Sequence, residues 1–263
     1  MLRGLYTSAL GMTTQMQRMD VVSNNLANVN TTAFKRDSVA AHAFSDRLAH
    51  RVDDPAVQGV LRLFSTRPPV GPTAAGVFID EVFTDFESGG LRATGSPLDV
   101  ALVGSGFFAV NVTNTDGSEQ EKFSRNGAFT LAADGTLVTI NGSRVQNQGG
   151  GNIVIPNGVI TIDATGRVFS NDEYVDTIRV VNVDNPESLR KTRGNYYTVT
   201  PETMMVDFTG QVQQGFLENS NVSAVREMVE LVALSRAYEA NSRMVQIHDE
   251  TLGRAVNEIA RRG

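Results

Sequence analysis

The sequence predicts an α+β protein in which long N- and C-terminal helices form a coiled-coil-like pair, joined by an irregular connector to a central antiparallel β domain. Apolar residues near both ends recur at alternating spacings of three and four, which places a narrow seam on one helix face. The residues between the ends alternate as strands do. The expected segments are an N-terminal helix (1–36), an extended connector (37–90), a β-rich outer domain (91–204), a return connector (205–221) and a C-terminal helix (222–263).

The first helix is expected over residues 2–28, where the residues of one face form a stripe. The members of this stripe are Leu2, Leu5, Ala9, Met12, Met16, Met19, Ser23 and Leu26. Gly4 and Gly11 interrupt the same segment, and each weakens a helix by roughly 1 kcal/mol relative to alanine. We therefore expect this helix to depend on packing partners for its stability.

Residues 28–32 favour turns and capping hydrogen bonds, so they mark the end of the first helix. Asn24 and Asn25 lie in the last turns before this end, where asparagine is a poor helix former. Either the helix frays there or the two side-chain amides bind a neighbouring backbone, and the sequence favours neither reading.

The connector over residues 37–90 has no clean hydrophobic period. Asp53, Asp54 and Pro55 predict a turn, and the stretch from Pro68 to Pro72 predicts an extended break. One short helix is expected near residues 40–49. Long segments without regular structure are uncommon inside compact domains and are often functional.

Residues 91–200 alternate apolar and other side chains in the manner of strands. The turn at Asp134–Gly135 lies between two apolar pairs, which is a hairpin signal. A second copy of the pattern follows 31 residues later, with Gly166 in the place of Gly135. We interpret the region as a small antiparallel domain built from successive hairpins.

The second helix is expected from about residue 222 to residue 261, with a length on the order of 60 Å if straight. Asn219, Ser220 and Asn221 are candidates for its N-cap. Its stripe keeps the spacing of a seam: Met228, Leu231, Ser235, Tyr238, Ser242, Val245, Asp249, Leu252, Val256 and Ile259.

Three positions of that stripe, Ser235, Ser242 and Asp249, are polar and share one heptad phase. Polar residues in a seam cost stability but select register and partner. One alternative is a helix turned so that another apolar face, containing Val232 and Ala240, is buried. Another is a polar row that faces a water-lined channel.

Composition excludes several classes of function. The net charge of −6 argues against binding to nucleic acid, because phosphate neutralisation needs a basic surface. The chain contains no cysteine, which excludes disulfides and thiolate metal sites. The first residues are unlike a secretory signal, so we expect no cleaved signal peptide. No apolar run approaches the ~20 residues of a membrane span, so we expect no membrane insertion.

No constellation of catalytic side chains stands out, so we expect neither enzymatic activity nor a cofactor. His42, His50 and His248 lack the spacing of a metal site. Gly104-Ser105-Gly106 begins like a phosphate loop, but a strand-like segment follows it instead of a helix N-terminus. We interpret it as a tight turn between strands.

Several blocks of the sequence resemble signatures of one protein family. Residues 23–35 (SNNLANVNTTAFK) closely resemble the N-terminal signature of bacterial flagellar rod and hook proteins. Residues 217–222 (LENSNV) and 236–241 (RAYEAN) resemble their C-terminal signature. The core β domain of the longer rod proteins is similar to residues 94–102 (TGSPLDVAL), 106–108 (GFF) and 124–129 (SRNGAF).

This resemblance implies an axial structural subunit of the flagellar basal-body rod, which transmits motor torque and encloses the export channel. Its terminal helices would pair within each subunit and form an inner tube, with the β domain outside. The implied partners are copies of itself, adjacent rod proteins, the flagellar type III export apparatus and surrounding ring proteins. Subunits would pass unfolded through the export channel to a rod in the periplasm.

The resemblance also bears on the position within the rod. Residues 94–102 and 148–156 look most like the proximal-rod member that has a β domain. The distal rod is the alternative, because residues 107–108 and 236–241 are at home there as well. An alternative from a different class is a ligand-binding or enzymatic β domain with helical tails.

The residues expected to carry assembly lie in the terminal helices and in the motif that ends the first one. In the N-terminal segment they are Leu5, Met12, Met16, Met19, Asn24, Asn25, Leu26 and Asn28. In the C-terminal helix they are Leu231, Ser235, Tyr238, Ser242, Val245, Asp249 and Leu252. We expect the three methionines to face Tyr238, Val245 and Leu252.

Overall fold

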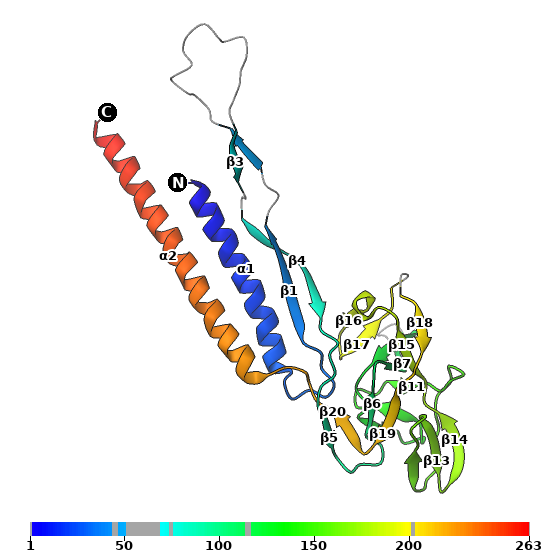
Figure 1. Ribbon diagram of the computed structural model, residues 1–263. Helices are drawn as coiled ribbons and strands as arrows, with labels where there is room; N and C mark the ends of the chain where they lie inside the picture. Colours follow the sequence, from blue (N-terminus) through cyan, green and yellow to red (C-terminus); the bar gives the residue numbers. More distant parts are fainter. Residues whose placement is uncertain are drawn as a thin grey trace, which may run out of the picture. The chain divides into compact units, whose positions relative to one another are not determined.

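The computed structural model of the chain (Figure 1) describes residues 2–43, 47–50, 69–73, 76–113, 117–200 and 203–262. It divides into two compact units. The first, called the helical unit below, comprises Met1–Asn24, Ser38–Phe83 and Val225–Gly263. The second, called the β unit, comprises Asn25–Asp37 and Thr84–Ala224.

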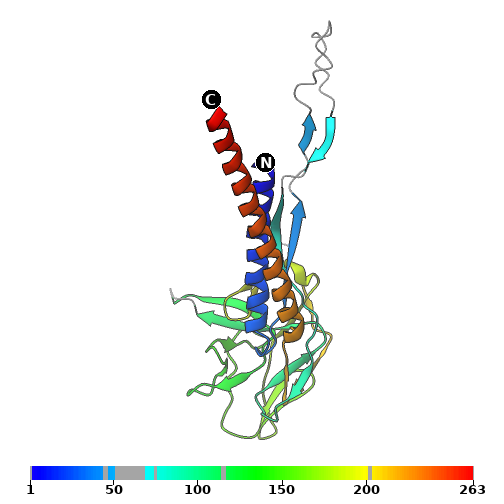
Figure 2. The ribbon, with the colours of Figure 1, turned by 90° about the vertical axis from the view of Figure 1, so that its left-hand side faces the viewer.

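In the helical unit, α1 (Leu2–Ala27) and α2 (Ala224–Arg262) lie side by side and run in opposite directions (Figures 1 and 2). β1 (Asp37–Ala43) pairs with β4 (Val77–Thr84), and the Oγ1 of Thr14 in α1 donates a hydrogen bond to the carbonyl of Val77 at 3.0 Å. α1 therefore contacts this ribbon as well as lying beside α2. A second short ribbon pairs β2 (Arg47–His50) with β3 (Pro69–Thr73).

Both predicted helices are confirmed to within about two residues. The end of α1 is closed by backbone hydrogen bonds from Asn28 and Val29 to the carbonyls of Asn25 and Leu26, three residues back, at 3.1 and 3.3 Å. α2 begins at Ala224, so Asn219–Asn221 lie too far before it to cap it, and that expectation is wrong. None of the described helices combines the length and the apolar character needed to cross a membrane.

The β unit is built around one large antiparallel sheet. Its main path runs in the order β16-β17-β8-β7-β11-β10-β9, while β15 pairs with β7 and β18 pairs with β15. The strands of this sheet are β7 (Phe107–Thr113), β8 (Glu119–Ser124), β9 (Phe129–Leu131), β10 (Leu137–Thr139), β11 (Arg144–Val145), β15 (Val180–Val183), β16 (Arg190–Thr192), β17 (Tyr196–Thr198) and β18 (Met205–Asp207). A short 3₁₀ helix, η2 (Pro186–Ser188), follows β15.

Three smaller sheets complete this unit. β12 (Ile160–Ile162), β13 (Arg167–Ser170) and β14 (Glu173–Thr177) form one of them. The other two join strands from opposite ends of the unit: β6 (Val100–Val103) pairs with β19 (Gln211–Gln214), and β5 (Leu91–Ala93) pairs with β20 (Phe216–Glu218). Residues 205–221, expected as a return connector, thus contribute three strands.

Apolar clusters lie on both faces of the large sheet. Because successive side chains of a strand point to opposite faces, neighbouring residues of one strand enter different clusters. Along β7, Phe108 and Val110 enter one apolar cluster together with Leu137 and Ile153. Phe107 and Ala109 alternate with them and enter a second cluster that contains Tyr197. A continuous apolar run in β7 is therefore required at the centre of the unit.

The predicted hairpins and their repeat are confirmed. The amide of Gly135 donates to the carbonyl of Ala132, and its own carbonyl accepts from Ile155 at 2.8 Å. Gly166 repeats this arrangement with Asp163 and with Ile178 at 2.9 Å. Both glycines have a φ near +80°, which favours glycine. Gly104-Ser105-Gly106 connects β6 to β7, as expected for a turn between strands.

The short helix expected near residues 40–49 is wrong, because β1 and β2 occupy this region. Its alanines favour a helix locally, but pairing with β4 and β3 decides the conformation, and tertiary context commonly overrides propensity. The turn expected at Asp53–Pro55 lies outside the described residues. Of the proline-rich break, the structure places Pro69–Thr73 in β3.

Candidate assembly surfaces

The covered face of α1 contains one row of the predicted stripe. That row is half-buried and consists of Leu5, Met12, Met19 and Leu26. The other predicted row is exposed and consists of Ala9, Met16 and Ser23. A neighbouring row is covered instead of the exposed one, and it consists of Gly4, Ser8, Gly11, Gln15, Arg18 and Val22. The sequence prediction weighted apolar side chains, and so it passed over the glycine and polar positions that α1 covers.

The covered face of α2 shows the same pattern. The half-buried row that was predicted consists of Leu231, Tyr238, Val245 and Leu252. The second covered row consists of Leu234, Asn241, His248 and Ala255. Ser235 and Ser242 are half-buried beside it, whereas Asp249 is exposed. The side chains of Leu2 and Ile259 lie outside the described residues.

The two helices meet closely at glycines of α1. A Cβ placed on Gly4 would lie 2.5 Å from Nε2 of His248, and one placed on Gly11 would lie 3.0 Å from Nδ2 of Asn241. At a rise of about 1.5 Å per residue, this register separates Met16 from the level of Val245 by ~13 Å. The expected facing of these two residues is therefore not observed.

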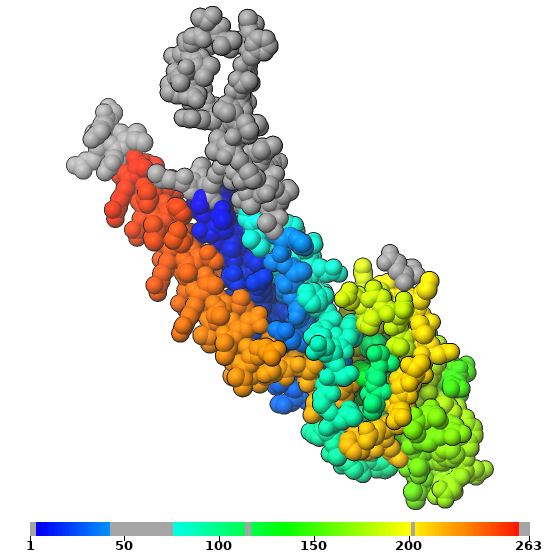
Figure 3. Space-filling model, viewed as in Figure 1, coloured from blue at the N-terminus to red at the C-terminus, as the bar shows by residue number. Residues whose placement is uncertain are grey.

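The helical unit also leaves large apolar side chains uncovered, and Figure 3 shows the outer face of α2 (orange to red) free of other elements. On α1 they are Tyr6, Leu10 and Met16, and on α2 they are Val225, Met228, Val229, Val232, Met244, Ile247 and Val256. Each is at least 38% exposed. Contiguous exposed apolar residues mark surfaces that bind other proteins.

In the β unit, three charged side chains from distant parts of the sequence meet away from solvent. Lys35 Nζ contacts Glu218 Oε1 at 2.7 Å, and Arg125 Nε contacts Glu218 Oε2 at 2.6 Å. All three side chains are no more than 4% exposed. We call this cluster the junction triad, because it ties the segment after α1, the β sheet and the segment before α2 together.

Backbone groups make further hydrogen bonds to all three members of the triad. Lys35 donates to the carbonyl of Glu87 at 2.7 Å, and Glu218 accepts from the amide of Gly89 at 2.9 Å. The Arg125 guanidinium donates to the carbonyls of Leu102, Gly104 and Gly106. Buried charges persist only when they are paired and hydrogen-bonded in this way.

The pKa of Glu218 follows from this setting. Burial alone would raise it, but the positive charges of Arg125 and Lys35 and their hydrogen bonds outweigh burial and hold the pKa of Glu218 below its ordinary value. Glu218 is therefore a carboxylate at neutral pH. By contrast, burial raises the pKa of the neighbouring Tyr197 far above its ordinary value.

Asparagine side chains hold the ends of the two terminal segments. Asn25 is fully buried; its Nδ2 donates to the carbonyl of Asp37 at 2.8 Å and its Oδ1 accepts from the amide of Asp37 at 2.9 Å. The amide-binding reading of the sequence is thus confirmed for Asn25. Asn24 is exposed, and Asn28 accepts a hydrogen bond from Thr31 at 3.1 Å.

Asn221, expected as a cap, has the same kind of role on the other side. Its Oδ1 accepts from the amide of Arg36 at 2.8 Å, and its Nδ2 donates to the carbonyl of Asp85 at 3.0 Å. A third tie comes from Lys191, which contacts both carboxylate oxygens of Asp37 and lies 3.8 Å from the ring centre of Phe34. These contacts fix the segment that follows α1 onto the rest of the β unit.

Lys35, Arg125 and Glu218 lie within the motifs that resemble the rod and hook family, but they are not among the predicted site residues. Lys35 and Glu218 are 183 residues apart in the sequence, and no local period connects them. Lys35 is the last residue of its resembling block, whereas Arg125 and Glu218 are the second residues of theirs. A charged residue within such a block gives no indication of its partner in the fold.

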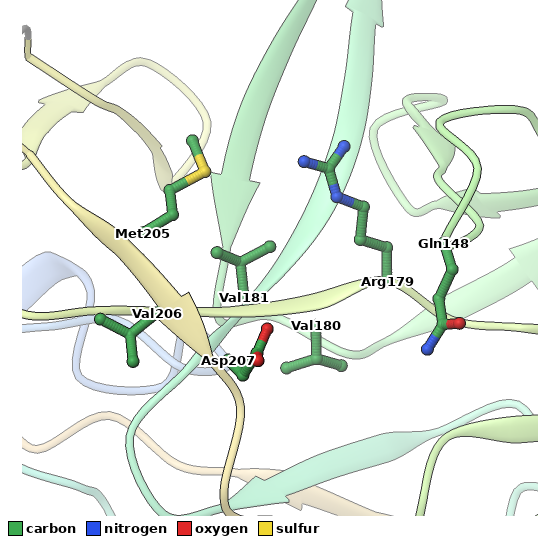
Figure 4. A pocket seen from close by; sticks show the side chains of 7 residues that line it. All are labelled: Gln148, Arg179, Val180, Val181, Met205, Val206 and Asp207. Carbon is green, nitrogen blue, oxygen red and sulfur yellow. The ribbon is translucent and has the colours of Figure 1, made fainter.

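The β unit also has an open depression of about 460 Å³ beside β15 and β18 (Figure 4). Arg179 and Asp207 contribute its charged side chains. Arg179 is engaged with Glu121 at 2.7 Å and with Gln146 at 2.8 Å. The lining contains no nucleophile paired with a base. Within the described residues, no three potential metal ligands lie together.

Comparison with protein families finds three matches in order along the chain. Residues 5–35 match the family described as flagella basal body rod protein. Residues 101–170 match the flagellar hook protein FlgE/F/G D1 domain. Residues 213–258 match the flagellar basal body rod FlgEFG protein C-terminal family.

Whole-length relatives agree with these matches. The flagellar basal-body rod protein FlgG of Agrobacterium fabrum is 35% identical over 266 residues, which cover 95% of this chain and 96% of the relative. FlgG of Borreliella burgdorferi is 32% identical over 275 residues, with 98% of each chain covered. The flagellar basal-body rod protein FlgF of Caulobacter vibrioides is 30% identical over 261 residues, again with 98% of each covered.

Proposed function

Because this chain belongs to the flagellar basal-body rod protein family, we propose that its terminal helices pair as a coiled coil and form the wall of an axial tube, with the β unit outside. The chain is a structural subunit of the basal body and not an enzyme. Polymerised axially, such subunits enclose the export channel and transmit motor torque.

The observation that carries this proposal is the apolar surface of the helical unit. Ten large apolar side chains of α1 and α2 are exposed in the single chain, as named above. Burying one such side chain contributes roughly 1.5–3 kcal/mol. A helix pair that leaves this many uncovered gains stability by packing against copies of itself and against adjacent rod proteins.

The predicted assembly residues divide between two kinds of contact in this proposal. The half-buried Leu5, Met12 and Met19 hold α1 within the subunit. The exposed Met16 and Asp249 are free to face a neighbouring subunit or the channel. Ser235 and Ser242, which are half-buried, keep the role of positions that select register and partner.

Within the rod we propose the proximal segment, with the distal segment as the alternative. The support is the resemblance of residues 94–102 and 148–156 to the proximal member that has a β domain. Relatives named FlgG and FlgF both match nearly the whole chain. Imaging of a tagged chain in rods arrested before the distal segment forms separates the two: a proximal subunit is present in them and a distal subunit is absent.

We further propose that the chain passes unfolded through the flagellar type III export apparatus, without a cleaved signal, to a rod in the periplasm where ring proteins surround it. The absence of cysteine supports this route, since no disulfide has to form after arrival in an oxidising compartment. Removal of the first 36 residues should abolish export if they contain the recognised segment. Secretion of the truncated chain at normal levels would contradict this.

The test of assembly changes one exposed side chain on α2. Ile247, 55% exposed, should lie between subunits, so Ile247→Glu places a charge in an apolar contact and should abolish concentration-dependent polymerisation, measured by sedimentation. Ile140→Glu is the matched control, because Ile140 is 74% exposed on the β unit. If both variants polymerise like the unchanged chain, α2 is not the assembly surface.

A further inference from the structure

Two glycines of α1 face two polar side chains of α2. At Gly4, an added Cβ would lie 2.5 Å from Nε2 and 2.7 Å from Cε1 of His248. At Gly11, it would lie 3.0 Å from Nδ2 and 3.3 Å from Cγ of Asn241. Real Cβ atoms do not approach other atoms as closely as the first of these distances, so the imidazole occupies the space that a methyl group would fill.

The spacing of these contacts makes them a repeated feature. Gly4 and Gly11 are seven residues apart, and so are Asn241 and His248, in the opposite order. Seven residues are one heptad, so both contacts fall on the same seam of an antiparallel pair. The two helices are therefore complementary at two points of this seam, where glycines of α1 face polar residues of α2.

The match distinguishes the observed register from its neighbours. A slip of one heptad in one direction would set Asn241 against Arg18, whose long side chain would fill the space that Gly11 leaves open. A slip in the other direction would set Leu234 against Gly11 and leave His248 without a glycine opposite it. Only the observed register places both polar side chains over glycine.

Glycine is a poor helix former, and α1 contains it at these two positions of its covered face. A contrast is given by Gly253 in α2, where no heavy atom lies within 4 Å of an added Cβ. Glycine at positions 4 and 11 is thus accounted for by close approach of α2, a use for which glycine is suited because it has no Cβ.

We propose that Gly4 and Gly11 are positioning residues that fix the register of α2 against α1 by receiving His248 and Asn241. Resting on the proposed function, this register sets the axial level of the two helices in the rod wall, since an error of one residue displaces one helix by about 1.5 Å. The register of α2 against α1 within one subunit is thus assigned to Asn241 and His248, one row away from Ser242 and Asp249.

The natural absence of cysteine allows the register to be read by disulfide formation in the full chain. Ser8 lies between Gly4 and Gly11 on α1, and Val245 lies between Asn241 and His248 on α2, so Ser8→Cys with Val245→Cys should crosslink rapidly. Met16→Cys with Val245→Cys is the out-of-register pair, about 12 Å further along α1, and should not. Dilute protein keeps the reaction within one chain, so the result is independent of polymerisation.

The register is then perturbed on the background of the Ser8–Val245 cysteine pair. Gly4→Ala with Gly11→Ala should slow crosslinking at least tenfold, although alanine is the better helix former. Gly253→Ala is the control, because no other group lies near an added Cβ there, and it should leave the rate unchanged. Adding His248→Ala and Asn241→Ala to the slow variant removes both obstructing side chains and should restore the rate.

Three results would overturn the proposal. They are preferential crosslinking of the Met16–Val245 pair, an unchanged rate in the Gly4→Ala, Gly11→Ala variant, and failure of the two α2 substitutions to restore the rate. Loss of polymerisation with a normal pattern of crosslinks would count against the proposed rod assembly and not against the register.

Discussion

At the scale of single residues, the β unit depends on a carboxylate held between two buried cations. Glu218 contacts Lys35 at 2.7 Å and Arg125 at 2.6 Å, so a single carboxylate is the ion-pair partner of both cations. Removing one partner of such a buried salt bridge destabilises the fold, because an uncompensated charge remains buried.

We predict that Glu218→Gln lowers the free energy of unfolding of the β unit by about 3–5 kcal/mol, since two cations would be left facing a neutral amide. Glu119→Gln is the matched control, because the Glu119–Arg144 pair is 47% and 46% exposed and exposed pairs contribute about 0–1 kcal/mol. Denaturant unfolding followed by circular dichroism measures both. Equal small losses would show that the triad is not a stabilising feature.

The same residue determines a response to acid. Because the pKa of folded Glu218 lies below the ordinary value of 4.5, the unfolded chain takes up its proton first as the pH falls. The contribution of Glu218 is present in full above that ordinary value and is lost as the pH falls through the folded pKa. Stability should therefore decrease with acidification in this range, and Glu218→Gln should flatten the curve. A slope unchanged by the substitution would contradict this assignment.

At the scale of elements, sequence patterns predicted long helices well and short strands poorly. Both terminal helices have a seam that repeats over many turns, and their bounds were predicted to within about two residues. β19 and β20 contain three to four residues each and pair with β6 and β5, more than a hundred residues away. Nothing local in residues 211–218 encodes such a partner.

The side-chain positions on the helices show the same division. The row of Leu231, Tyr238, Val245 and Leu252 was found because apolar residues define it. The row of Asn241 and His248 was missed because both residues are polar and because the α1 residues opposite them are glycines. Neither kind of residue fits an apolar seam. Binding of a neighbouring backbone by Asn25 was one of the two alternatives that the sequence left open, but the partner, Asp37, became evident only from the fold.

The pairing of chain ends predicts how fragments of the β unit behave. Residues 91–204 form the expected outer domain, but they lack β19, whose buried Val212 enters the core cluster, and they lack Glu218. We predict that a fragment of residues 25–224 unfolds cooperatively and at a higher temperature than a fragment of residues 91–204. Calorimetry of both fragments tests this, and equal melting temperatures would mean that the outer domain closes without its terminal strands.

At the scale of the whole molecule, the chain divides its tasks between two compact units. The β unit buries its own apolar residues in two clusters, and the triad with its asparagine ties secures the segments next to α1 and α2. The helical unit leaves apolar side chains of α1 and α2 uncovered. This division supports the proposed self-association through the helices, and membership of the rod family agrees with it.

The central claim is that the terminal helices build the wall of the rod around its channel while the β unit faces outward. A cryo-EM reconstruction of intact basal bodies in which this subunit is located tests that claim most directly. The account predicts α1 and α2 in the inner wall, packed against those of neighbouring subunits through the surface that contains Ile247, with the β unit at larger radius. A reconstruction with the β unit lining the channel, or with the exposed apolar face of α2 in contact with solvent, would contradict it.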